Sequence, residues 1–172
     1  MKPSEWVVER RGIVVSGRGN ATSLLRGRKA LNEYFGEEPH PGSLNILLDW
    51  PIEFCPARVK IRLEDYLLAW AGRVEGHRCL VQRWPNCPLH VVEVISPHRF
   101  RLEKGQRARV QFHSIDLAPL PWSKLFGWGA LWGLRRRYVY SSDRYDHWAQ
   151  EVAARWPAWF GQQPLERDGR LR

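Results

Sequence analysis

Apolar and polar side chains alternate in short runs along the first two thirds of the chain, and prolines and glycines separate these runs. Runs of this length, rich in β-branched and aromatic residues, are typical of strands. They predict strands at residues 6–16, 44–48, 57–63, 67–74, 77–84, 90–96 and 107–115. Because their spacing is short and regular, we expect a mainly β fold, a small barrel or sandwich. Gly12 lies between two β-branched runs, which predicts a bulge or tight bend in the first strand.

One stretch before residue 44 has helical rather than alternating spacing. Its apolar residues, at 24, 25, 31, 34 and 35, have roughly helical spacing over residues 22–35, although Gly27 interrupts the stretch. Gly36 follows directly and is a candidate C-cap, since glycine adopts the left-handed conformation that ends many helices. The pattern predicts a short helix before the second strand.

The composition changes beyond residue 118. Residues 121–172 hold six of the ten tryptophans, in an aromatic stretch interrupted by glycines, and Asp143 is a candidate N-cap for a later helix. With Lys124 inside it, the apolar run here is too short to span a bilayer. We expect a β-barrel domain over residues 1–118 and an α-helical, Trp/Arg-rich extension over residues 119–172, packed on the barrel as additional core or as part of an acceptor pocket.

Length, composition and charge limit the classes of protein to which this chain can belong. A chain of 172 residues with 44% hydrophobic and 26% charged residues has the composition of a folded protein of one ordinary domain, so wholly disordered and collagen-like chains are excluded. The 27 cationic residues give a net charge of +9, and 22 of them are arginine. Because the planar guanidinium suits phosphate, the excess favours a nucleotide, a nucleic acid or an anionic lipid surface, although genomic base composition also produces arginine-rich chains.

The cysteines indicate a reducing compartment. The chain has an odd number of cysteines, Cys55, Cys79 and Cys87, and no CxxC pair, which argues against a disulfide framework. Cys87-Pro-Leu-His90 matches no standard zinc spacing, so we interpret the thiols as buried or incidental. The first residues lack an apolar region of signal-peptide length, and we expect a cytoplasmic protein.

Four motifs occur in a specific order: GIVVSGRGNA at 12–21, PGSLNILLD at 41–49, HVVEVISPHRFR at 90–101 and KGQRARVQF at 104–112. They contain neither the third glycine of a dinucleotide fingerprint nor the GK[ST] of a P-loop. Their order resembles the CTP-dependent riboflavin kinases best known from archaea, over residues 10–112. The resemblance implies a compact cradle-loop, RIFT-like β-barrel. It also implies transfer of the γ-phosphoryl group of CTP, with Mg²⁺, to the 5′-hydroxyl of riboflavin, giving FMN.

The glycine-rich loop supplies the first part of the expected nucleotide site. Gly17 and Gly19 let the backbone approach a phosphate chain, and successive N–H groups in such a turn form an anion-binding nest. Arg18 adds positive charge. By resemblance, the nucleotide-binding set is Gly17, Arg18, Gly19, Asn20, Ala21, Thr22, His98, Arg99, Phe100 and Arg101.

Ser43 and Asn45 are the expected metal ligands. They are two residues apart in an extended segment, so their side chains share one face and offer two neutral oxygens, which suits Mg²⁺. The family has threonine at the first position, and serine preserves the hydroxyl. The alternative interpretation is a turn at Gly42-Ser43 with a local hydrogen bond between side chain and backbone.

Glu93 is the expected catalytic residue. It alternates with Val91 and Ile95, so a carboxylate shares an apolar face, which costs free energy unless the group is paired or functional. By resemblance it matches a glutamate near the acceptor hydroxyl, where it orients that hydroxyl or accepts its proton. The alternative is a structural salt bridge to an arginine.

The acceptor region departs from the family pattern. Trp84-Pro85-Asn86 stands where the family has a flavin-contacting threonine, the segment after Pro97 is shorter, and Lys104-Gly105-Gln106 replaces a D-G-D turn. Riboflavin is the default acceptor, and a sugar or lipid-linked sugar is the alternative. The aromatic and basic stretch 122–137 suits a carbohydrate or a peripheral membrane contact. A non-enzymatic alternative is a nucleic-acid-binding barrel that uses the three arginines at 135–137 and exposed tryptophans.

Overall fold

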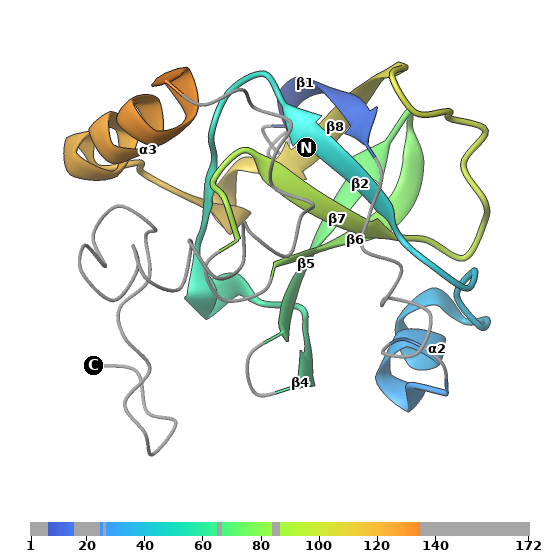
Figure 1. Cartoon of the computed structure of the whole chain (residues 1–172). Coiled ribbons are helices and arrows are strands. Elements are labelled where there is room, and N and C mark those ends of the chain that lie inside the picture. The colour runs from blue at the N-terminus through green and yellow to red at the C-terminus, as the bar shows by residue number, and fades with distance from the viewer. Residues whose placement is uncertain (1–6, 16–24, 26, 65–66, 84–86, 135–172) are drawn as a thin grey trace, which may run out of the picture.

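The computed structural model describes residues 7–15, 25, 27–64, 67–83 and 87–134, with the side chains of Glu64 and residues 131–134 left out. Six strands form a closed antiparallel barrel (Figure 1). They are β1 (Val7–Val15), β2 (Leu44–Leu48), β5 (Leu67–Val74), β6 (His77–Arg83), β7 (Val91–Ile95) and β8 (Arg107–His113). Their order around the barrel is β5-β6-β7-β2-β1-β8, and β8 pairs with β5 to close it. The predicted mainly β barrel fold is therefore confirmed.

Most strand predictions agree with the structure to within a residue or two, and one is wrong. The predicted strand 57–63 begins instead as a 3₁₀ turn, η1 (Pro56–Arg58), and only β4 (Ile61–Glu64) is extended. Pro56 has its φ fixed by its ring, which suits the first position of a helical turn. The last predicted strand also ends early, because a second 3₁₀ turn, η2 (Ser114–Asp116), follows β8. Two short strands that the sequence pattern did not predict, β3 (Glu53–Phe54) and β9 (Leu117–Ala118), pair with each other.

Gly12 does not form the predicted bulge. β1 pairs without interruption through this residue, with Leu48 on β2 and Ala108 on β8. A Cβ at this position would lie 2.5 Å from the carbonyl oxygen of Leu47. Gly12 therefore allows the close approach of β1 and β2.

The inward faces of the strands enclose the main core. Phe54 stacks on Trp70 with ring centroids 4.5 Å apart and meets Phe112 edge to face at 5.4 Å. The indole Nε1 of Trp70 donates a hydrogen bond to the carbonyl of Cys55 at 2.9 Å, so the buried ring keeps a polar partner. Aliphatic side chains complete this cluster: Val14, Ile46, Leu48, Ile52, Val74, Val81, Val92, Val94 and Val110.

A second apolar cluster lies on the outer face of the sheet, beneath the helix α2 (Lys29–Phe35). Leu31 of α2 is completely buried there, against Ile61, Leu80 and Ile95. The predicted helix 22–35 is interrupted, because Gly27, with a φ of +70°, stands between helical Leu25 and the start of α2 at Lys29. Residues 22–24 and 26 lie outside the described residues. Gly36 caps the helix as expected, with its N–H donating to the carbonyl of Asn32.

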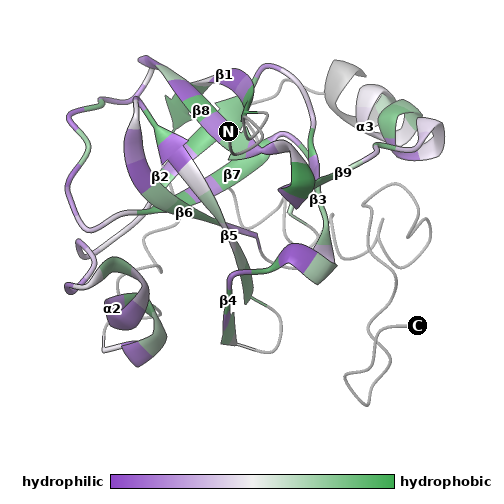
Figure 2. Ribbon diagram, turned by 180° about the vertical axis from the view of Figure 1, so that it is seen from behind, coloured by the Kyte–Doolittle hydropathy of each residue, from purple (hydrophilic) through white to green (hydrophobic). Residues whose placement is uncertain are grey.

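The helix α3 (Trp122–Leu134) lies on the opposite side of the barrel from α2 (Figure 2). Lys124 of α3 forms an ion pair with Glu53 on β3, and the indole Nε1 of Trp128 donates to Nδ1 of buried His90 at 2.8 Å. These contacts join the described part of the predicted extension to the barrel, while the boundary at residue 118 stays a prediction. The helix predicted after Asp143 lies outside the described residues. In the described part of the chain, no helix has the length and apolar character needed to cross a membrane.

Candidate functional site

Three polar residues lie in one row across the outer face of three neighbouring strands. Asn45 of β2 stands opposite Glu93 of β7, and Glu93 stands opposite Gln82 of β6. Residues directly opposite each other in a sheet project to the same face. Asn45 and Gln82 are almost fully buried, whereas Glu93 is partly exposed. The row therefore places a carboxylate between two amides at the margin of the second apolar cluster.

Ser43 joins this row from the turn before β2. Its hydroxyl donates a hydrogen bond to Oε1 of Glu93. Gly42 precedes it with a φ of +101°, a conformation that L side chains rarely adopt, so the glycine of the PGSLN motif is what allows the chain to enter β2 in this direction. The structure brings Ser43, Asn45 and Glu93, three of the predicted site residues, together.

The two structural alternatives for these residues receive no support from the observed contacts. The hydroxyl of Ser43 bonds to the distant Glu93 rather than to its own turn. No arginine among the described residues lies within ion-pair distance of Glu93, so the salt-bridge interpretation has no partner in that part of the chain.

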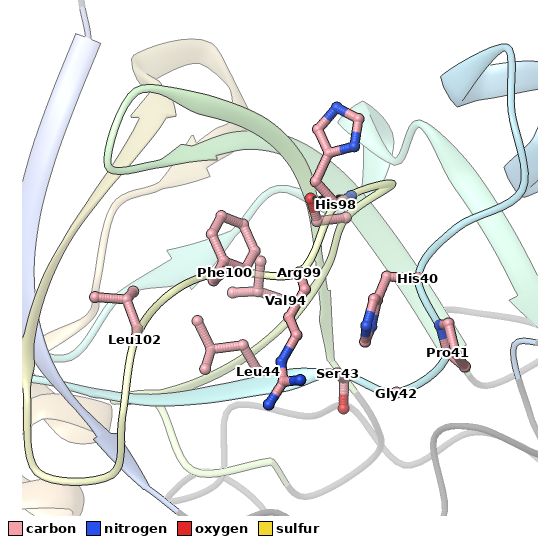
Figure 3. A pocket seen from close by; sticks show the side chains of 11 residues that line it. His40, Pro41, Gly42, Ser43, Leu44, Val94, His98, Arg99, Phe100 and Leu102 are labelled. Carbon is pink, nitrogen blue, oxygen red and sulfur yellow. Dashed lines mark hydrogen bonds between the residues drawn. The ribbon is translucent and has the colours of Figure 1, made fainter.

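A cavity of about 190 Å³ opens beside Ser43. Figure 3 shows Arg99 reaching from the segment after β7 toward β2, with Leu44 on one side and Ser43 and His40 on the other. His98 and Phe100, two of the predicted nucleotide contacts, also line the cavity, and none of its described lining residues is a carboxylate. Arg99 supplies a permanent positive charge to this lining, which suits phosphate groups.

Arg101 lies elsewhere. It lines a second cavity, of about 410 Å³, together with His77 and Glu75. His98, Arg99 and Phe100 line both cavities, whereas Ser43 lines only the first and Arg101 only the second. The structure thus places Arg101 apart from Ser43. The other predicted nucleotide contacts, Gly17, Arg18, Gly19, Asn20, Ala21 and Thr22, lie outside the described residues.

Sequence reasoning missed two residues of this region. Gln82 has its side-chain oxygen buried with no hydrogen-bond partner among the described residues. Such an atom calls for an explanation, because most buried polar atoms are paired. The signal was present in the β6 sequence, where a glutamine interrupts an apolar run, but its pairing with β7 could not be read from one strand. His40 lies in the cavity because its backbone N–H bonds to the carbonyl of Ser96, which fixes the turn before Gly42.

The oxygen atoms of this site fit a hard cation. Ser43, Asn45 and Glu93 offer a hydroxyl, an amide carbonyl and a carboxylate, the ligand types that Mg²⁺ prefers. A hydroxyl that donates its proton to Glu93 keeps its lone pairs for a cation. Among the described residues, no three His, Cys, Asp or Glu side chains gather as a metal site, so a thiolate or imidazole centre gains no support there.

Burial changes the pKa of two groups on β6. Desolvation in the core raises the pKa of the Cys79 thiol to about 12. Burial likewise lowers the pKa of Arg83, while the nearby Cys87 and Glu53 act in the opposite direction. The Arg83 guanidinium donates to the carbonyl of Leu89 at 2.7 Å and lies 5.3 Å from the centre of the Phe54 ring. These contacts give both groups structural rather than chemical roles.

Comparison with known proteins adds no family to these observations, because no protein-family model and no curated protein sequence matches this chain. The assignment of chemistry therefore depends on the geometry of the site and on the resemblance of its motifs.

Proposed function

We propose that the chain is a CTP-dependent, Mg²⁺-assisted kinase that transfers a phosphoryl group to the hydroxyl of a small molecule, with riboflavin as the default acceptor. The observation that supports this most is the contact between Ser43 and Glu93 at the rim of the cavity that Arg99 lines. In this proposal Ser43 is a metal ligand, Glu93 is the proton acceptor, and the neighbouring cavity takes the phosphates. The motif order supports cytidine as the base.

In this proposal, Arg99 and His40 hold the phosphates of CTP in the cavity, and Ser43 and Asn45 hold Mg²⁺ beside them. The cation, when bound, neutralises charge on the transferred group, the main requirement of phosphoryl transfer. Glu93 accepts the proton of the acceptor hydroxyl while the oxygen of that hydroxyl forms a bond to the γ-phosphorus of CTP. The bond from the γ-phosphorus to the oxygen that bridges it to the β-phosphate breaks, and CDP leaves.

Nucleotide binding is the first test. CTP with Mg²⁺ should raise the melting temperature of the protein more than ATP with Mg²⁺, because a ligand that binds only the folded state stabilises it. Equal shifts with the two nucleotides would contradict the cytidine assignment. Alternatively, the protein could bind single-stranded RNA with an affinity that falls as salt rises, and show no change in melting temperature with CTP. That result would favour a nucleic-acid-binding barrel.

Turnover of Asn45→Ala is the second test. Removing a metal ligand should lower kcat/KM by about 10²-fold or more, on the order of 3 kcal/mol. Asn32→Ala on α2 makes the same chemical change outside the site and should leave kcat/KM unchanged. The assay uses riboflavin and a panel of sugars as acceptors. Wild-type kcat/KM for Asn45→Ala would show that the metal site is elsewhere.

A further inference from the structure

The helix α3 is oriented with its charge toward the protein. Lys124, the one charged residue in its sequence, pairs with Glu53, and both side chains are more than four-fifths buried. Trp128 faces the same way and bonds to His90. A surface helix normally turns its apolar side chains inward and its charges outward, so this arrangement is inverted.

The opposite face of α3 carries exposed aromatic side chains. Trp122 is 84% exposed and Phe126 is 73% exposed. They are four residues apart, so they lie one above the other on the helix, and exposed Gly129 continues the same stripe. Trp50, 52% exposed, lies next to α3, with its ring centroid 6.2 Å from that of Trp128. Trp122, Phe126 and Gly129 define an outward stripe with no charged residue.

Positive charge follows this stripe directly in the sequence. Three consecutive arginines, residues 135–137, come immediately after the last residue of α3, and the whole chain carries a net charge of +9. Aromatic rings on one helix face, followed in the sequence by a run of cations, match the two layers of an anionic bilayer surface.

We propose that α3 docks the protein on anionic lipid bilayers, with Trp122 and Phe126 at the depth of the lipid headgroups. A nucleic acid that stacks on these rings would need cations beside them, and the stripe has none among its residues. A lipid surface needs cations only at the level of the phosphates. This proposal is independent of the kinase assignment.

Co-sedimentation of the full chain with vesicles tests the proposal. Vesicles of phosphatidylcholine with one quarter phosphatidylglycerol should bind the protein at least tenfold more strongly than vesicles of phosphatidylcholine alone, and binding should fall as salt rises. The double change Trp122→Ser with Phe126→Ser should reduce the partition at least tenfold. Val7→Ser removes an exposed apolar side chain outside α3, on β1, and should leave the partition unchanged.

A second pair of variants distinguishes a loss of vesicle binding from a loss of the folded structure. A side chain at Gly129 would meet no atom within 4 Å, so both Gly129→Ala and Gly129→Asp should fold. Gly129→Ala should bind vesicles like the wild type, whereas Gly129→Asp should bind at least fivefold more weakly. Absence of wild-type binding, or equal binding by these two variants, would overturn the proposal. A dimer that dissociates on changing Trp122 and Phe126, without vesicle binding, would also overturn it, because a second copy would then be the partner.

Discussion

The hydroxyl of Ser43 donates a hydrogen bond to the carboxylate of Glu93, although the two residues are 50 positions apart in the sequence. Pairing of β2 with β7 produces this contact, since Asn45 and Glu93 stand opposite each other in the register. The hydrogen bond fixes the direction of the hydroxyl proton. The proposed metal ligand and the proposed proton acceptor are thereby in direct contact, and a change at either should affect the other.

Ser43→Ala should lower kcat/KM by about 10²-fold, because it removes both an oxygen ligand and the hydrogen bond to Glu93. Ser43→Thr keeps the hydroxyl and should stay within about threefold of the wild type in kcat/KM. The measurement is steady-state turnover of CTP with the identified acceptor. Equal rates for the alanine and threonine variants would show that the hydroxyl has no part in the reaction.

Glu93→Gln should preserve CTP affinity while lowering kcat by about 10²-fold or more, because the amide keeps the shape but cannot accept the acceptor proton. Calorimetric titration with CTP and a turnover assay separate the two effects. If binding and turnover fall together, Glu93 holds the nucleotide or the metal rather than the acceptor proton.

Gln82→Met replaces a buried amide by an apolar side chain of similar size. Since the amide oxygen has no partner among the described residues, its removal should change the free energy of unfolding by less than about 1 kcal/mol. KM for the acceptor should rise about tenfold if that oxygen binds the acceptor. Gln111→Met on β8 is the matched control for KM. A large loss of stability with unchanged KM would make Gln82 a structural residue.

Gly12→Ala should lower the free energy of unfolding by about 3 kcal/mol, because the new methyl would lie 2.5 Å from the carbonyl oxygen of Leu47 in the paired strands. Gly129→Ala, which has open space, should be neutral or stabilising by up to about 1 kcal/mol. Urea unfolding curves of both variants provide the comparison. Equal free energies of unfolding for the two variants would mean that β1 and β2 can move apart with little loss of stability.

Stability above pH 9 should depend on Cys79. Burial raises the pKa of its thiol from 9.0 to about 12, so the folded protein keeps a proton that the unfolded chain loses. Stability therefore falls as pH rises from 9 toward 12, by up to about 1.4 kcal/mol per pH unit from this group. In Cys79→Ala this contribution disappears, so the stability difference between wild type and variant should shift in favour of the variant over that range. If the difference in free energy of unfolding between wild type and Cys79→Ala, measured by urea unfolding, does not change with pH, this prediction is wrong.

The strands could be predicted from sequence because each one carries its own alternating pattern, as the match of β2 and β5 with the predicted ranges shows. The alternating pattern of a single strand does not show which residues of the neighbouring strand lie opposite its own. Gln82 interrupts the apolar run of β6, but only its place opposite Glu93 brings it into the site. Gly12 was misread for the same reason, since the sequence shows a flexible residue but not the neighbouring strand that comes within 2.5 Å of its missing side chain. The orientation of α3 was beyond prediction too, because the partner of Lys124 is 71 residues away.

Closure of the barrel by β8 has a consequence for folding during synthesis. β8 is the last of the six barrel strands, and it must pair with both β1 and β5. Until His113 has left the ribosome, both of these strands keep an open edge, and such edges invite pairing with other chains. The seam between Val7 and His113 also joins residues far apart in sequence, which slows folding. The nascent chain is therefore most prone to aggregation between the synthesis of β7 and that of β8.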